Sequence, residues 1–147
     1  MVLSDLVVAN DETDGIIAAL QQATHVTLHV LAVRLAHLEL APSEQNVLAV
    51  LADGGRRTVG DVAAATGTRP TTLTSVLDRL ERRRLVRRQL DPADRRSFLI
   101  TLTPPGRQAA RSVRAAITDL ERAALAALMP AQLAGFRAVT RALGQAH

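Results

Sequence analysis

Apolar residues in the middle of the chain recur first with the period of a helix and then with the period of a strand. Around residues 71–82 they lie three and four positions apart, which predicts a helix with one core-facing stripe. From Phe98 onward they alternate with polar or opposite-face residues, which predicts a half-buried strand. The helical stripe is Leu73, Val76, Leu77 and Leu80, and the strand positions are Phe98, Ile100 and Leu102.

A turn-forming segment separates the two strands that follow this helix. It runs Asp91-Pro92-Ala93-Asp94-Arg95-Arg96, in which aspartate and proline favour a turn and the arginines are expected at the tip. A helix followed by a two-stranded wing is typical of a winged helix-turn-helix. The fold class is therefore predicted as mainly α (α+β).

The flanking pattern predicts further helices. A long helix over Ile16–Leu38 has apolar residues on two opposite faces, which indicates burial from two directions, one of them by a partner subunit. Pro42 opens a helix, Thr58 and Asp61 are spaced as a capping box, and Pro70 lies in the first turn of the next helix. After a break at residues 103–106, two amphipathic helices are expected, the second beginning at Pro130.

Charge is distributed unevenly along the chain. Residues 1–61 hold three arginines and eight acidic residues, whereas residues 62–147 hold fifteen arginines and six acidic residues. Nine of those arginines lie within Arg69–Arg96, and such a cluster favours binding to a phosphate backbone. A solvated basic helix face is the plainer interpretation of the same charges.

Composition excludes several classes of chemistry. The chain has no cysteine, which rules out disulfides and thiolate metal sites. No glycine-rich phosphate loop and no nucleophile–base spacing is present, so we expect no enzyme activity and no cofactor. No apolar run is expected to reach the length of a membrane span, and the acidic N-terminus does not look like a signal peptide. Cytoplasmic localisation without membrane binding is the expectation.

The solvent face of the helix over residues 71–82 is the candidate DNA-reading surface. Small hydroxyls and arginines hydrogen-bond base edges and phosphates without obstructing a groove. The candidates on and just before this helix are Thr68, Arg69, Thr71, Thr72, Thr74, Ser75, Arg79 and Arg82.

Several segments, taken in order, resemble the MarR family of bacterial repressors over about residues 36–106. The segment Leu40–Leu48 (LAPSEQNVL) is similar to that family's second-helix signature. The remainder follow its recognition-helix and wing pattern: Thr72-Leu73-Thr74, Leu80-Glu81, Leu85-Val86-Arg87-Arg88, Asp91–Arg96 and Leu102-Thr103-Pro104-Pro105-Gly106.

This resemblance implies a single domain over 1–147, with a flexible arm at 1–14, dimerisation helices at 15–39 and 104–147, and a DNA-binding lobe at 40–103. It implies a homodimer that binds double-stranded DNA at a pseudo-palindromic operator as a repressor, released by a small aromatic effector. Arg96 is then the minor-groove arginine, Asp94 the carboxylate that orients it, and Arg95 a less certain neighbour. Arg84 stands where the family often has glycine at a left-handed helix end.

Two other functions stay open at this point. His25 and His29 lie four residues apart, a spacing that would suit either an effector pocket or a shared metal ion, with His37, Glu39 and Glu44 as further ligands. A metal-responsive regulator is therefore one alternative, although no metal site is predicted. A non-specific architectural DNA-binding protein is the other, because basic charge alone would serve it.

Overall fold

The computed structural model describes residues 15–146, and the arm expected over 1–14 lies outside them. The element order is α2 (Ile16–Arg34), η1 (Ala36–Leu38), α3 (Pro42–Leu51), β1 (Arg57–Thr58), α4 (Val59–Thr66), α5 (Pro70–Arg82), β2 (Val86–Leu90), β3 (Phe98–Leu102), α6 (Pro104–Leu125) and α7 (Pro130–Gly144). The fold is thus mainly helical with one small sheet, as the sequence pattern predicts.

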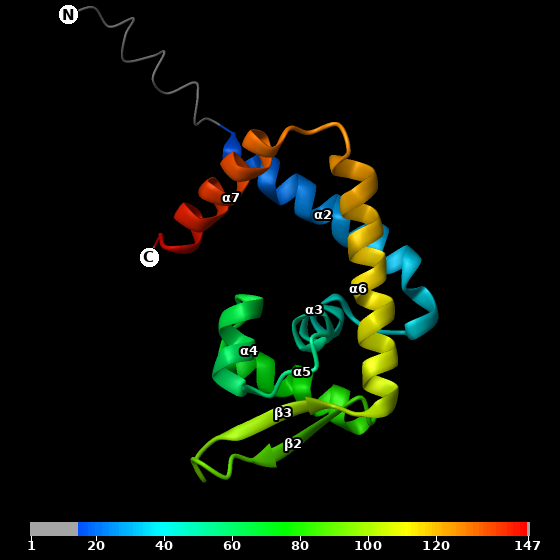
Figure 1. The fold of residues 1–147 in the computed structure, drawn as a ribbon, viewed down its shortest axis with the longest axis vertical. Helices are drawn as coiled ribbons and strands as arrows, with labels where there is room; N and C mark the ends of the chain where they lie inside the picture. Colours follow the sequence, from blue (N-terminus) through cyan, green and yellow to red (C-terminus); the bar gives the residue numbers. More distant parts are fainter. Residues whose placement is uncertain (1–14, 147) are drawn as a thin grey trace, which may run out of the picture.

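The hydrophobic core lies in the lobe formed by α3, α4, α5 and the sheet. Leu48, Leu73, Leu77, Leu80 and Ile100 are completely buried there. The stripe predicted on α5 is confirmed, because all four of its members are in this core. Figure 1 shows the lobe at one end of the molecule and α2 and α7 at the other, with α6 running between them.

The sheet has three antiparallel strands in the order β1-β3-β2, in which β2 and β3 form the predicted wing and β1 adds a third strand that was not predicted. In β1, Arg57 pairs with Ile100 and Thr58 with Leu99. A two-residue strand has no measurable alternation, which is why the pattern of the sequence did not reveal it. The strand ties the start of α4 to the base of the wing.

Two helix boundaries also differ from the prediction. The first helix ends at Arg34, not Leu38, because the chain tightens into η1 and Glu39 adopts a positive φ of 52° before Pro42. Residues 104–106, expected as a break, are the first turn of α6, where prolines are tolerated because their missing N–H groups have no helical partner.

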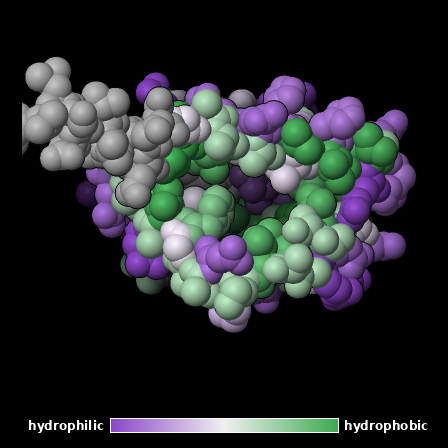
Figure 2. Space-filling view, turned by 90° about the horizontal axis from the view of Figure 1, so that it is seen from above, coloured by the Kyte–Doolittle hydropathy of each residue, from purple (hydrophilic) through white to green (hydrophobic). Residues whose placement is uncertain are grey.

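The two end helices expose much of their apolar surface. No residue of α2 or α7 is buried. Among described residues, the exposed large hydrophobic side chains outside the wing all lie on α2, on α7 or around the end of α6: Ile17, Val26, Leu28, Val33, Leu125, Leu128, Met129, Phe136 and Val139. Figure 2 shows hydrophobic side chains covering much of this end of the molecule around a hollow.

The expectation that no apolar run reaches the length of a membrane span is wrong for α2. By length and composition this helix is apolar enough to cross a membrane, and none of the corresponding window is buried. The same property follows from a helix with two apolar faces that the monomer leaves uncovered.

Candidate nucleic-acid interface

The helix-turn-helix is held in shape by local hydrogen bonds. Thr58 Oγ1 accepts from the Asp61 backbone N–H at 3.1 Å, and Asp61 accepts from the Thr58 N–H at 2.9 Å, forming the predicted capping box of α4. The Thr58 N–H is the main cause that lowers the pKa of the Asp61 carboxyl. Gly67 ends α4 with a φ of 64°, and Pro70 then starts α5. These caps set the direction of the recognition helix.

The hydroxyl-bearing residues of α5 are on its exposed face, where they were predicted. Thr71, Thr72, Thr74 and Ser75 are all exposed. Thr74 Oγ1 donates to the Pro70 carbonyl at 3.0 Å, and Ser75 Oγ donates to the Thr72 carbonyl at 2.9 Å. Their oxygens therefore keep lone pairs that accept from a ligand, and rotation about χ1 would free the hydroxyl hydrogens.

Arg79, a candidate DNA contact on the same helix, already uses part of its guanidinium in a bond within the protein. Its Nε donates to Glu44 Oε1 at 2.9 Å, and Glu44 is 5% exposed. The other Glu44 oxygen accepts from the Ala41 N–H at 2.8 Å, so this carboxylate links the start of α3 to α5. Arg79 serves as the counter-ion of a buried acid, and only its remaining N–H groups are available to a ligand.

Arg88, on β2, is also paired within the protein. It forms ion pairs with both Asp78 and Glu81, which lie one turn apart on α5. Glu81, and after it Asp78, raises the pKa of the Arg88 guanidinium above its ordinary value. This network fastens the wing to the recognition helix, so an expectation that Arg88 binds phosphate is not supported by its contacts.

The two arginines that end α5 differ in what they do. Arg82 is exposed, and its closest bond is a long one of 3.4 Å to the Asp78 carbonyl. Arg83 donates to the carbonyls of Glu39 at 2.7 Å and Leu38 at 2.8 Å. Arg83 thereby joins the recognition helix to the segment that connects α2 with α3, whereas Arg82 stays available to solvent.

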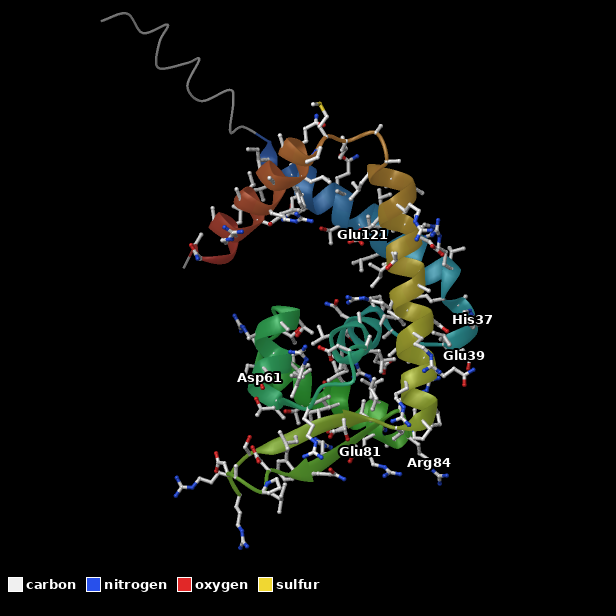
Figure 3. The ribbon with its side chains drawn as sticks, viewed as in Figure 1. His37, Glu39, Asp61, Glu81, Arg84 and Glu121 are labelled. Carbon is white, nitrogen blue, oxygen red and sulfur yellow. The ribbon has the colours of Figure 1, made fainter. Side chains whose placement is uncertain are left out.

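The wing turn is shaped by its own aspartates. Asp91 accepts from the Ala93 N–H, and Asp94 accepts from the Arg96 N–H at 3.0 Å. Within residues 15–146 the ion pairs include none between the Asp94 and Arg96 side chains, so Asp94 orients Arg96 through its backbone. Arg95 and Arg96 are both exposed, and Figure 3 shows nitrogen-ended side chains projecting from the end of this hairpin.

The joint between α5, the wing and α6 depends on residues of the Leu-Thr-Pro-Pro-Gly segment. Arg84 has a positive φ of 59°, which confirms the left-handed helix end expected there. Thr103 Oγ1 donates toward the Arg84 carbonyl at 2.6 Å and accepts from the Gly106 N–H at 3.0 Å. A Cβ on Gly106 would lie 1.7 Å from the Leu85 carbonyl oxygen, so only glycine fits.

A cavity of about 280 Å³ lies where α2, α3 and α6 meet. Leu28, Leu31, Val113 and Ile117 supply apolar lining, and the polar lining is Ser43, Gln45, Asn46 and Thr68. Thr68 thus lines this cavity, while Arg69 is the exposed N-cap of α5. His25 and His29, the candidate effector residues, are exposed on α2 and do not line the cavity.

The structure offers no support for the metal-responsive alternative. Among residues 15–146 no group of three or more histidines, aspartates or glutamates is placed to hold a metal ion. Figure 3 shows His37, which lies in η1, and Glu39, which follows η1, while Glu44 is already engaged by Arg79 and Ala41.

Several of these contacts are not predictable from the sequence. The pairs Glu44–Arg79 and Arg83–Leu38 join residues more than thirty positions apart, and no local pattern encodes them. The acids Asp78 and Glu81 were visible near the arginines, and their i, i+3 spacing is the one signal that pointed to an internal partner for Arg88.

A sequence model of the MarR family matches residues 38–97, which correspond to the lobe and most of the wing. A comparison with curated proteins found no match.

Solved structures extend the likeness to nearly the whole chain. BpsR of Bordetella bronchiseptica, whose DNA binding is regulated by 6-hydroxynicotinic acid, is 27% identical, with a TM-score of 0.75 over 92% of this chain and 96% of that one. CouR of Rhodococcus jostii RHA1, solved with p-coumaroyl-CoA, is 26% identical, with a TM-score of 0.79 over 92% and 95%. A MarR-family regulator of Rhodococcus sp. RHA1 is 26% identical, with a TM-score of 0.73 over 90% and 94%. Residues 38–97 thus match the MarR family, and the capped helix-turn-helix with its arginine-tipped wing has the winged helix fold of these regulators.

Proposed function

We propose that this protein is a sequence-specific repressor that binds a pseudo-palindromic operator as a homodimer and is released by a small aromatic effector. The observation that carries the DNA-binding part is the exposed hydroxyl face of α5 beside the exposed Arg95 and Arg96 of the wing turn. On this proposal α5 enters a major groove, and each wing turn enters the neighbouring minor groove.

Contacts to DNA bases and contacts to DNA phosphates are assigned to different residues. Thr71, Thr72, Thr74 and Ser75 face outward with lone pairs available, which suits contacts to base edges. Arg69 and Arg82 are exposed, and neither enters an ion pair within the described residues, which suits contacts to phosphate. Arg79 is assigned a secondary role, because Glu44 holds its Nε.

The homodimer is supported by the uncovered apolar surface of α2 and α7. A folded monomer with side chains such as Val33 at 65% and Phe136 at 58% exposure gains free energy when a second copy covers them. Two-fold symmetry would then place the two α5 helices about 34 Å apart, one turn of DNA.

Effector release is supported by the cavity between α2, α3 and α6. Its lining joins α2 and α6 to α3 of the lobe, so a ligand there contacts parts that would move relative to one another when the operator is released. Apolar walls with a few polar groups suit a small aromatic molecule, and the regulators BpsR and CouR were solved in connection with aromatic ligands. The ligand acts only if it binds the two arrangements with different affinity.

The first test is binding selection from a random duplex pool of about 30 base pairs, followed by footprinting on the recovered sequence. We expect two inverted half-sites and one discrete footprint. A uniform affinity for all sequences would instead support the architectural alternative. Loss of the footprint on adding small aromatic acids would support the effector.

The second test is Arg96→Ala on the selected duplex. Because Arg96 is exposed at the turn, its removal should leave the thermal transition unchanged and weaken binding about tenfold or more. Asp94→Ala should cause a smaller loss of affinity, since it removes the hydrogen bond that holds the Arg96 backbone but no contact with DNA. Unchanged affinity of the Arg96 variant in a mobility-shift titration would remove the wing from the proposed interface.

A further inference from the structure

Two exposed apolar side chains lie at the outer end of the wing, away from the other apolar surface. Leu90 is the last residue of β2, Phe98 the first of β3, and the two are direct partners in the register. They are 56% and 45% exposed. The sequence pattern put Phe98 on the same face as Ile100, and the register confirms that face, but Phe98 is exposed because it lies at the outer end of its strand.

The face on which this pair lies follows from the register. Alternation along β2 puts Leu90 on the same face as the buried Val86, and alternation along β3 puts Phe98 on the face of the buried Ile100. That face is the one packed on the helices of the lobe, and α5 contacts β2. The pair therefore extends the α5 side of the wing beyond the core, as the projecting hairpin in Figure 1 illustrates.

The turn beside the pair carries charges of both signs, because Asp91 and Asp94 lie in it together with two arginines. The turn that follows Leu90 and precedes Phe98 carries the exposed Arg95 and Arg96. The carboxylates of Asp91 and Asp94 accept from backbone N–H groups of the turn, which leaves the two exposed arginine side chains as the cations offered to a partner. A polyanion with apolar surface of its own is the partner that satisfies both properties.

Double-stranded DNA is such a partner. If α5 lies in a major groove and the wing turn in the adjacent minor groove, the sugar–phosphate strand between the grooves must cross the α5 side of the wing. Phosphates on that strand face the arginines, and the deoxyribose rings present C–H groups. We infer that Leu90 and Phe98 form an apolar pad that packs on the deoxyribose rings of this strand. The inference rests on the proposed DNA-binding function.

The decisive property of the pad is that its contribution does not depend on salt. Leu90→Ser and Phe98→Ser remove apolar contact without removing charge, so each should weaken binding to the selected duplex about fivefold to thirtyfold. The slope of log affinity against log salt should stay that of the unsubstituted protein. Arg96→Ala should lower the affinity and flatten the slope, because it removes a cation.

Matched controls separate the pad from a structural effect. Gln89→Ser lies on the opposite face of the same strand, where the side chain is exposed, and should leave affinity unchanged. Phe98→Leu keeps an apolar contact and should restore most of the affinity lost in Phe98→Ser. Thermal unfolding of each variant establishes that the lobe is intact.

A fluorescence measurement tests the contact directly. The chain has no tryptophan and no tyrosine, so Phe98→Trp introduces the sole strong fluorophore. Binding to the selected duplex should reduce acrylamide quenching of this indole several-fold, and Leu90→Trp should behave alike. Equal quenching with and without DNA, in a variant that binds the duplex, would overturn the pad. Absence of any salt-dependent binding by the unsubstituted protein would overturn the proposed function itself.

Discussion

At the scale of single residues, the joint after the recognition helix is the most demanding position in the chain. Thr103 donates toward the Arg84 carbonyl and caps α6, while Gly106 brings the first turn of α6 against the backbone at Leu85. Arg84 contributes the left-handed turn between them. The Leu-Thr-Pro-Pro-Gly segment is therefore a packing requirement of the fold, independent of any contact with DNA.

Gly106→Ala should destabilise the protein by roughly 2 kcal/mol or more, because the new Cβ would overlap the Leu85 carbonyl and the backbone must move. We expect the melting temperature to fall by about 5 °C or more in a thermal scan. Gly60→Ala in α4 is the matched control, since its Cβ would meet nothing closer than Thr58 Oγ1 at 3.7 Å. It should be neutral or slightly stabilising. Equal melting temperatures for the two variants would contradict this account of the joint.

The sequence predicts those contacts and backbone conformations that depend only on residues close together in the chain. The Thr58–Asp61 box follows from spacing, the left-handed Arg84 follows from the family resemblance, and both are present. The partners of Arg79 and Arg88 were not predictable, because they depend on how α3, α5 and β2 pack together. Exposure of Phe98 was missed for the same reason, since alternation identifies a face but not where its cover ends.

At the scale of elements, the arginines around α5 divide into those that hold the lobe together and those that stay exposed. Arg88 binds Asp78 and Glu81 across the α5–β2 contact. Arg83 ties the end of α5 to the η1 segment. Arg82 and Arg69 are exposed. Fewer arginines in this region are therefore available to bind phosphates than the sequence contains.

Substitution of Arg88 and Arg82 by the same residue separates these roles. Arg88→Met keeps the aliphatic stem but breaks both ion pairs, so it should destabilise the protein by about 1 kcal/mol and leave the salt slope of DNA binding unchanged. Arg82→Met should leave the melting temperature unchanged and flatten the slope by about 0.9 per subunit. A flatter slope in the Arg88 variant would show that this arginine contacts phosphate after all.

At the scale of the whole molecule, the chain has a well-packed lobe at one end and helices without buried residues at the other. The two-faced apolar pattern of residues 16–38 predicts this imbalance. The sequence does not predict which helix faces would contact a second copy, because the apolar pattern of one chain does not determine how two copies pair.

Phe136→Arg tests the proposed dimer. The side chain is 58% exposed in the monomer, so the substitution should not disturb the lobe, yet in a dimer it would place a charge in an apolar interface. We expect sedimentation to show a monomer and operator affinity to fall steeply, with the helical content unchanged. Gln89→Arg, exposed on the wing, serves as the control and should remain dimeric. A dimeric Phe136 variant would place the interface on other surfaces.

Helix α6 has a mechanical consequence for control of the operator. Its first turn is fixed to the end of α5 through Thr103, and its 22 residues reach about 33 Å to the far end of the molecule. A rigid lever of that length displaces its tip by about 3.4 Å for a tilt of about 6°, and 3.4 Å is the rise of one base pair. An effector that binds between α2 and α6 and tilts α6 by about 6° would thus shift each recognition helix along the DNA by about one base pair.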